Sequence, residues 1–267
     1  ERPEAATLRR SEPMGAGHSH ALYVHEHSVV HEMAPQAKLV AALGMVVCIA
    51  ITPREAIWAF AVYAVVVSRL TAMSRVRHGF VAVRLLAVAP FILFSLFIPF
   101  IASGETTEVL GVTVSVEGLW GTWNILVKAL LGASVSILLT ATTEIPDIIR
   151  GLSILRVPAL FISITTFMIR YLELISEELR RMRVAMTSRG YDPRWISQAR
   201  PIASSAGALF VRSYERGERV HAAMLARGFT GEMPMPTPEP VDRSQWAVVL
   251  SLVTVFAVTA IVALVVT

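Results

Sequence analysis

The sequence predicts an all-α integral membrane protein with about five transmembrane helices and a cytoplasmic domain of long amphipathic helices. First, the 267 residues are 54% hydrophobic and 16% charged, whereas a soluble domain carries roughly 25% charged residues. Second, the apolar stretches 85–104 and 244–267 each reach the about 20 residues that cross a bilayer. Third, apolar residues between 158 and 190 recur at steps of three and four, which is typical of an amphipathic helix.

Three further apolar segments in the N-terminal half are interpreted as spans. Residues 118–143 are long enough but contain Lys128, which we interpret as a structural lysine; a lysine facing a polar pocket stays open as the alternative. Residues 39–51 and 56–68 are shorter, and the proline and two charges between them predict a turn. They form either two spans or a shorter hairpin. Lys38 is expected to extend from the first of them to the membrane surface.

The charges between the apolar stretches predict the topology, because Lys and Arg are retained on the cytoplasmic side of a bacterial membrane. The loop 69–84 carries four arginines and is placed inside, whereas 105–117 carries three glutamates without Lys or Arg and is placed outside. If the apolar stretch 157–169 crossed, the eleven arginines of 177–243 would be exported, so we expect it to lie on or against the membrane. The prediction is a multi-pass inner-membrane protein with a cytoplasmic N-terminus and an extracytoplasmic C-terminus.

Two long helices are expected in the cytoplasmic segment before the last span. The first begins at Pro158, which suits a first helical turn, and ends at Gly190. The second runs from about Ile202 and ends at Gly228. Beyond it, residues 233–240 have a proline at every second position, which predicts a semi-extended linker to the last span.

The same short phrase closes both predicted helices. The chain reads AMTSRGYD at 185–192 and AMLARGFT at 223–230. Glycine allows the left-handed conformation that ends a helix, and the arginine before it then stands at the tip, where the negative end of the helix dipole favours it. A helix stop with a solvated charge would explain one copy. Two copies at matching helix ends favour a pair of guanidinium groups that bind carboxylates on a partner protein.

These paired phrases resemble the two Ala-Arg-Gly motifs on the coupling helices of the T component of energy-coupling factor (ECF) transporters. The stretch 212–234 looks like the cobalt-type branch of that family, CbiQ, and 151–161 resembles the stretch that opens the coupling domain. VHEMAPQAKL (30–39) is similar to the start of the same branch. The residues that carry this last similarity are His31, Pro35, Lys38 and Leu39. The first motif departs from the family pattern, because Ser188 stands where alanine is expected.

The resemblance implies a non-catalytic scaffold in the lipid bilayer. It would join a CbiM-like substrate-binding membrane subunit to two cytoplasmic, CbiO-like ATPase subunits of the ABC type. Whether a small accessory membrane subunit also takes part stays open. ATP would be bound by the partners, and no cofactor is expected in this chain, which lacks a G-x-x-x-x-G-K-[ST] loop. The ATPase-binding residues that the resemblance implies are Ala185, Met186, Ser188, Arg189, Gly190, Ala223, Met224, Ala226, Arg227 and Gly228.

The predicted organisation follows from these assignments. It comprises a polar His-rich tail (1–33), a membrane domain of four spans (34–143), a cytoplasmic coupling-helix domain (144–232), a Pro-rich linker (233–243) and a final transmembrane helix (244–267). The branch resemblance implies cobalt as the cargo, for cobalamin biosynthesis. Nickel or another ECF substrate is the alternative within the family.

Other functional candidates are weaker. The tail contains His18, His20, His25, His27 and His31, and imidazoles bind cobalt, nickel or zinc, but no cysteine or ordered carboxylates fix a geometry, so no specific metal site is predicted. No catalytic constellation of a membrane enzyme is found, and glutamates interrupt the arginine-rich helices, which excludes nucleic acid as a partner. A self-sufficient transporter or channel, with Lys128 lining the path, remains the rival class and would carry substrate alone in liposomes.

Overall fold

The structure, a computed structural model, describes residues 28–102, 106–109, 112–191, 200–231 and 242–266. The chain divides into two compact units. Unit 1 is formed by the described residues of Glu1–Gly151 and Glu239–Thr267, and unit 2 by those of Leu152–Pro238. Unit 2 is therefore a single continuous stretch inserted into the sequence of unit 1.

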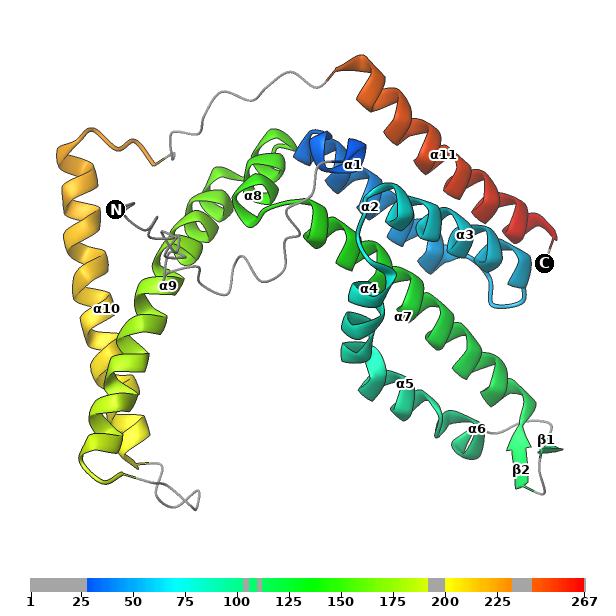
Figure 1. The fold of residues 1–267 in the computed structure, drawn as a ribbon, viewed down its shortest axis with the longest axis horizontal. Coiled ribbons are helices and arrows are strands. Elements are labelled where there is room, and N and C mark those ends of the chain that lie inside the picture. Colours follow the sequence, from blue (N-terminus) through cyan, green and yellow to red (C-terminus); the bar gives the residue numbers. More distant parts are fainter. Residues whose placement is uncertain (1–27, 103–105, 110–111, 192–199, 232–241, 267) are drawn as a thin grey trace, which may run out of the picture. The chain divides into compact units, whose positions relative to one another are not determined.

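The described chain is almost entirely helical, as predicted, with one short hairpin (Figure 1). In chain order the elements are α1 (Val29–Glu32), α2 (Pro35–Ile51), α3 (Ile57–Met73), α4 (His78–Leu85), the 3-10 turn η2 (Leu86–Val88), α5 (Ala89–Ser95), α6 (Ile98–Ile101), β1 (Thr106–Val109), β2 (Val112–Ser115), α7 (Val116–Thr142), α8 (Ile145–Ile154), α9 (Ala159–Ser188), α10 (Arg200–Ala226) and α11 (Arg243–Val266).

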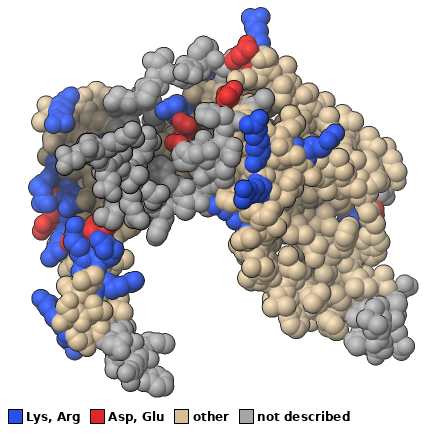
Figure 2. Space-filling model, in the orientation of Figure 1, with Lys and Arg blue, Asp and Glu red and all other residues tan. Residues whose placement is uncertain are grey.

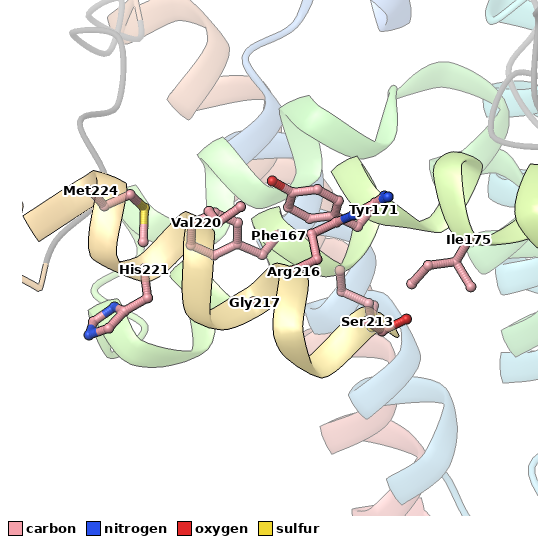
Figure 3. A pocket seen from close by; sticks show the side chains of 10 residues that line it. Phe167, Tyr171, Ile175, Ser213, Arg216, Gly217, Val220, His221 and Met224 are labelled. Atoms are coloured by element: carbon pink, nitrogen blue, oxygen red, sulfur yellow. The ribbon is translucent and has the colours of Figure 1, made fainter. Parts of the chain in front are cut away.

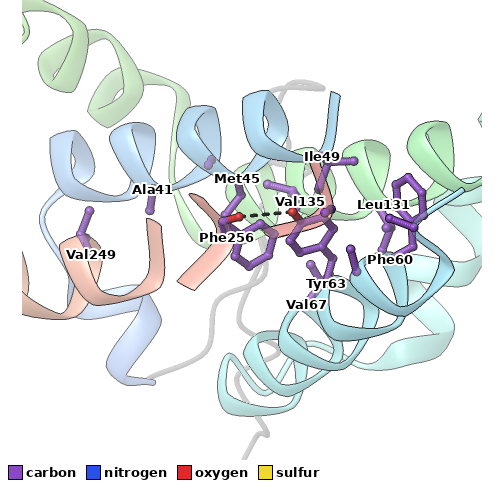
Figure 4. Packing of buried hydrophobic residues seen from close by; sticks show 14 of the residues in the cluster. Ala41, Met45, Ile49, Phe60, Tyr63, Val67, Leu131, Val135, Val249 and Phe256 are labelled. Carbon is purple, nitrogen blue, oxygen red and sulfur yellow. Dashed lines mark hydrogen bonds between the residues drawn. The ribbon is translucent and has the colours of Figure 1, made fainter. Parts of the chain in front are cut away.

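The core of unit 1 lies between α2, α3, α7 and α11 (Figure 4). Tyr63 of α3 and Phe256 of α11 are fully buried, and their stacked rings lie 4.5 Å apart between centroids. The Tyr63 hydroxyl donates to the backbone oxygen of Phe256 at 3.2 Å and hydrogen-bonds the Thr52 hydroxyl at 3.0 Å. Burial of polar groups is tolerated because they are paired, so this network fixes how α2, α3 and α11 meet.

The predicted span 85–104 is part of a longer, interrupted helical segment. It begins at His78 and passes through α4, η2, α5 and α6, with Pro90 and Pro99 removing backbone donors on the way. The segment packs along α7: the Thr122 hydroxyl donates to the Ser95 backbone oxygen at 2.8 Å. A Cβ added to Gly118 of α7 would lie 2.5 Å from the Cα of Pro99, so this contact requires glycine.

The loop predicted at 105–117 contains a two-stranded antiparallel hairpin. Strands β1 and β2 pair with Thr106 opposite Ser115 and Val109 opposite Val112. The sequence analysis interpreted this segment as an outside loop because it contains three glutamates and no Lys or Arg. Threonine and valine dominate both strands, and β-branched residues favour extended backbone, which accounts for the difference.

The protein is a multi-pass membrane protein. In the described residues, four helical segments are long and apolar enough to cross a bilayer: His78–Ile101, Val116–Thr142, Ala159–Ser188 and Arg243–Val266. Helices α2 and α3 are shorter and apolar, and the predicted turn at 52–55 lies between them. Length and apolar composition identify helices that can cross a bilayer, but they do not determine which side of the membrane a loop faces. The surface position of 157–169 and the orientation of the termini therefore stay predictions.

Side-chain charge is unevenly distributed between the units. Figure 2 shows Lys and Arg gathered on the helices of unit 2, whereas the visible face of unit 1 is largely uncharged. In unit 1 many large apolar side chains are exposed, such as Phe94 at 76%, Ile101 at 79% and Val265 at 80%. Exposed apolar surface of this extent is expected of helices in contact with lipid.

Asp242 lies just before α11, outside the predicted membrane span. The Ser244 hydroxyl donates a hydrogen bond to its carboxylate, which lowers the pKa of Asp242.

Candidate functional site

Unit 2 contains two long helices, α9 and α10, that run antiparallel. Glu178 of α9 accepts a hydrogen bond from Arg212 of α10 at 2.7 Å, and the Ser205 hydroxyl lies 3.5 Å from the sulfur of Met186. As residue numbers fall along α9 they rise along α10, which defines the antiparallel arrangement. These two contacts join the C-terminal half of α9 to the N-terminal half of α10.

An apolar groove opens between the other halves of the same helices (Figure 3). It has a volume of about 430 Å³. Its lining residues are Phe167, Met168, Tyr171 and Ile175 of α9 and Ser213, Arg216, Gly217, Val220, His221 and Met224 of α10. The sequence analysis identified the apolar stripe of α9 but not its counterpart on α10. Only Val220 and Met224 of the α10 lining are large apolar residues, so hydrophobic periodicity carries little signal for this face.

The C-terminus of α9 ends in a Schellman motif. Gly190 has φ of +77°, the left-handed conformation that glycine adopts without a steric penalty. Its N–H donates to the Thr187 backbone oxygen at 2.9 Å, and the N–H of Tyr191 donates to that of Met186 at 3.1 Å. This pair of bonds satisfies carbonyls that the end of a helix leaves open.

The C-terminus of α10 has the same structure, residue for residue. Gly228 has φ of +80°, its N–H donates to the Leu225 backbone oxygen at 3.0 Å, and the Phe229 N–H donates to that of Met224 at 3.0 Å. In both caps the methionine and the aromatic residue occupy the positions whose apolar contact commonly accompanies a Schellman motif. Met224 and Phe229 are half-buried. The repeated phrase is therefore a repeated helix cap, and the prediction that both copies lie at helix ends is confirmed.

The cap does not account for the arginine that it contains. Arg189 and Arg227 are exposed and occupy the position just before the left-handed glycine. Among the residues that the structure describes, neither guanidinium forms an ion pair. Other arginines of unit 2 do, since Arg180 and Arg181 pair with Glu177 and Glu178 at 2.8 and 3.0 Å. Two unpaired cations thus stand at the negative ends of two helix dipoles.

The remaining residues of the predicted site surround these arginines. Ala185, Ala223 and Ala226 are exposed small residues beside them. The hydroxyl of Ser188 donates to the Val184 backbone oxygen at 3.0 Å, so its donor is satisfied within α9. The serine therefore adds little beyond the alanine of the second copy.

Other sequence candidates are placed differently. Lys128 of α7 donates to the backbone oxygen of Ala50 near the C-terminus of α2 at 2.8 Å, a bond between helices that accords with a structural role. His31 forms a hydrogen bond with the Ser28 hydroxyl at 2.8 Å, and the other tail histidines lie outside the described residues. Within the described ranges, no group of three or more His, Cys, Asp or Glu side chains could hold a metal ion.

Comparison with known proteins places the chain in a family. Residues 26–237 match the family model of CbiQ, described as cobalt transport protein. The chain belongs to the CbiQ family. The matched range includes both capped helix ends and the groove between α9 and α10.

Individual relatives agree with this membership. The chain is 27% identical over 228 residues to the energy-coupling factor transporter transmembrane protein EcfT of Streptococcus thermophilus, covering 78% of this chain and 84% of that protein. It is 32% identical over 105 residues to the cobalt transport protein CbiQ of Rhodobacter capsulatus, covering 38% and 42%. It is 29% identical over 115 residues to a putative fused cobalt transport protein CbiMQ of Methanocorpusculum labreanum, covering 43% of this chain and 19% of that protein.

Proposed function

We propose that this CbiQ-family chain is the transmembrane T component of an ECF-type importer, with cobalt as the cargo, and that it has no catalytic activity of its own. In this proposal Arg189 and Arg227 each bind one ATPase subunit, and a separate membrane subunit binds the substrate. The names of the relatives CbiQ and EcfT support the transporter class and the cargo.

The observation that carries the docking role is the pair of identical helix caps with unpaired arginines. Each cap fixes the backbone of the last turn through two hydrogen bonds, so each guanidinium starts from a rigid support. A rigid support lowers the entropy lost on binding, and a guanidinium pairs with a carboxylate through two parallel hydrogen bonds. Two equivalent ends fit a partner that is present in two copies.

The residues beside each arginine support a protein partner. Small alanines leave room for close approach, and the half-buried Met186 and Met224 provide an adaptable apolar surface. An apolar patch around a charged anchor is common at the centre of protein interfaces. We infer that each helix tip enters a groove whose floor is apolar and which contains at least one carboxylate.

The direct test is co-purification after charge reversal. Arg189→Glu combined with Arg227→Glu is expected to abolish recovery of the ATPase subunits, because a carboxylate would face the carboxylate of the partner; truncating such a pair costs about 2–5 kcal/mol at each site. Membrane insertion should be unchanged. The matched control is Arg183→Glu with Arg216→Glu, which reverses two exposed arginines of the same helices that lie outside the two cap motifs. A normal yield of complex from the first variant would contradict the docking role.

The transporter class is tested separately with purified protein. In liposomes, the chain alone should give no cobalt flux, and uptake should require the ATPase subunits, the substrate-binding subunit and ATP. Flux from the chain alone would instead favour a self-sufficient transporter. Competition by nickel in the same assay would decide between the two ions.

A further inference from the structure

The first turn of α2 is buried although two of its residues are polar. Gln36, Ala37 and Lys38 are 3%, 0% and 7% exposed. The expectation that Lys38 extends to the membrane surface is therefore wrong, and its ammonium lies inside unit 1. A buried charge is stable only when it is paired or hydrogen-bonded. The hydrogen-bond partners of Lys38 therefore show which helices this turn joins.

The ammonium of Lys38 joins three helices. Its Nζ donates to the backbone oxygen of Thr142, the last residue of α7, at 2.8 Å, and to that of His31 in α1 at 2.9 Å. The C-terminus of a helix carries partial negative charge, and the carboxylate of Asp147 in α8 adds to the favourable potential. Lys38 thus fastens the end of α7 to the start of α2.

Two more contacts converge on the same stretch, residues 31–39. A Cβ added to Gly151 of α8 would lie 2.7 Å from Leu39 Cδ1, 3.1 Å from the Gln36 nitrogen and 3.2 Å from the Pro35 carbonyl carbon. Glycine costs about 1 kcal/mol inside a helix, and this close approach explains its presence. On the other side, the Ala34 N–H donates to Gln245 Oε1, in the first turn of α11, at 3.0 Å.

These contacts lie beside the two connections of unit 2. The chain leaves unit 1 after Gly151 and returns to it at Glu239, shortly before α11 begins at Arg243. Helix α8 on the outgoing side and helix α11 on the returning side are therefore both held by residues 31–39. A displacement passed along either connection therefore acts on a helix that contacts residues 31–39 directly.

We propose that residues 31–39 form an anchor that makes α2, α7, α8 and α11 move together, and that Lys38 is its positioning residue. The anchor would transmit displacement of unit 2 to the membrane helices during transport. This inference rests on the proposed function, because it concerns how ATP hydrolysis by partner subunits is converted into movement of the substrate-binding subunit. Without the anchor, the ATPase cycle would move unit 2 while the membrane helices followed incompletely.

The test measures cobalt taken up for each ATP hydrolysed by the complete complex in proteoliposomes. Lys38→Met keeps most of the side-chain volume and removes all three donors. Complex yield and ATP hydrolysis should stay near the wild-type values, whereas the uptake ratio should fall by about tenfold, since mutations in coupling elements act on this scale. A purely structural lysine would lower yield and stability without changing the ratio.

Lys128→Met is the matched control. Lys128 also joins α7 to α2 through a backbone oxygen, that of Ala50 at 2.8 Å, but at the opposite end of α2. Its uptake ratio should remain within about twofold of wild type, because its bond lies outside residues 31–39 and contacts neither connection of unit 2. A wild-type ratio for Lys38→Met, or an equal loss for Lys128→Met, would overturn the proposal.

A second variant tests the anchor if the Lys38→Met complex does not assemble. Gln245→Leu removes only the tie to Ala34 from a half-buried position, and it should also lower the uptake ratio; an unchanged ratio would overturn the anchor. The wild-type complex separates this inference from the proposed function. If wild type neither assembles nor transports cobalt, the proposed function fails and the anchor with it. If wild type transports cobalt and either variant keeps its uptake ratio, only the anchor fails.

Discussion

Replacing the glycine of one helix cap should loosen the end of α10 and with it the position of Arg227. Gly228 has φ of +80°, and an alanine held in the left-handed region costs about 1–2 kcal/mol. No atom lies within 4 Å of the position a Cβ would take, so Gly228→Ala introduces backbone strain without a clash. The cap should therefore open more often by a factor of roughly 5–30.

Hydrogen exchange measures this opening directly. The reporter is the Phe229 amide, which donates to the Met224 backbone oxygen at 3.0 Å and exchanges only when the cap opens. Gly207→Ala is the matched control, since it lies in the interior of α10 with open space around it and a helical φ; it should stabilise the helix by up to about 1 kcal/mol. The expected result is faster exchange at Phe229 in Gly228→Ala alone; under the proposed function, this variant should also bind the ATPase subunits more weakly.

Unchanged protection of the Phe229 amide in Gly228→Ala would refute the reasoning that the left-handed glycine holds the cap. Unchanged protection together with weaker ATPase binding would mean that the added methyl group obstructs the interface. The same experiment on Gly190, with φ of +77°, tests whether the two caps are equivalent in solution.

Three further predictions concern stability, measured as thermal unfolding of the purified protein in detergent. Glu178→Gln removes the ion pairs of Glu178 with Arg181 and Arg212, which are accessible to solvent, so it should lower the melting temperature only slightly and the difference should vanish in concentrated salt. Gly151→Ala brings a Cβ within 3.2 Å of backbone atoms of α2 and should cost about 1–3 kcal/mol, whereas Gly132→Ala, in open space on α7, should be neutral or stabilising. Tyr63→Phe removes the two hydrogen bonds of the hydroxyl, to the Phe256 backbone oxygen and to Thr52, and should cost about 0.5–1.5 kcal/mol; an unchanged melting temperature would argue against these bonds.

The sequence predicted well those elements whose ends are marked locally. Helix α9 was expected at 158–190 and is found at Ala159–Ser188, and α11 was expected at 244–267 and is found at Arg243–Val266. Proline, glycine and a change from apolar to polar composition mark these ends within a few residues. The Schellman geometry also follows from the phrase, because glycine and the aromatic residue after it occupy fixed positions of the motif.

Features that depend on distant contacts could not be predicted in this way. Lys38 was interpreted as a lysine at the membrane surface because the neighbouring sequence is apolar. Its partner Thr142 lies 104 residues away, and no local pattern indicates such a bond. The close approach at Gly151 likewise depends on α2, so the sequence alone carried no signal for it. The interruption of the 78–101 segment, in contrast, is marked locally by Pro90 and Pro99, which the sequence analysis did not use.

The insertion of unit 2 as one unbroken stretch, Leu152–Pro238, has a consequence for engineering and for evolution. Both capped arginines and the groove lie on this cassette, while the anchor and the membrane core belong entirely to the flanking sequence. Under the proposed function, a single exchange at two breakpoints would therefore replace the proposed ATPase-binding surface with that of a homologue and leave the sequence of unit 1 unaltered.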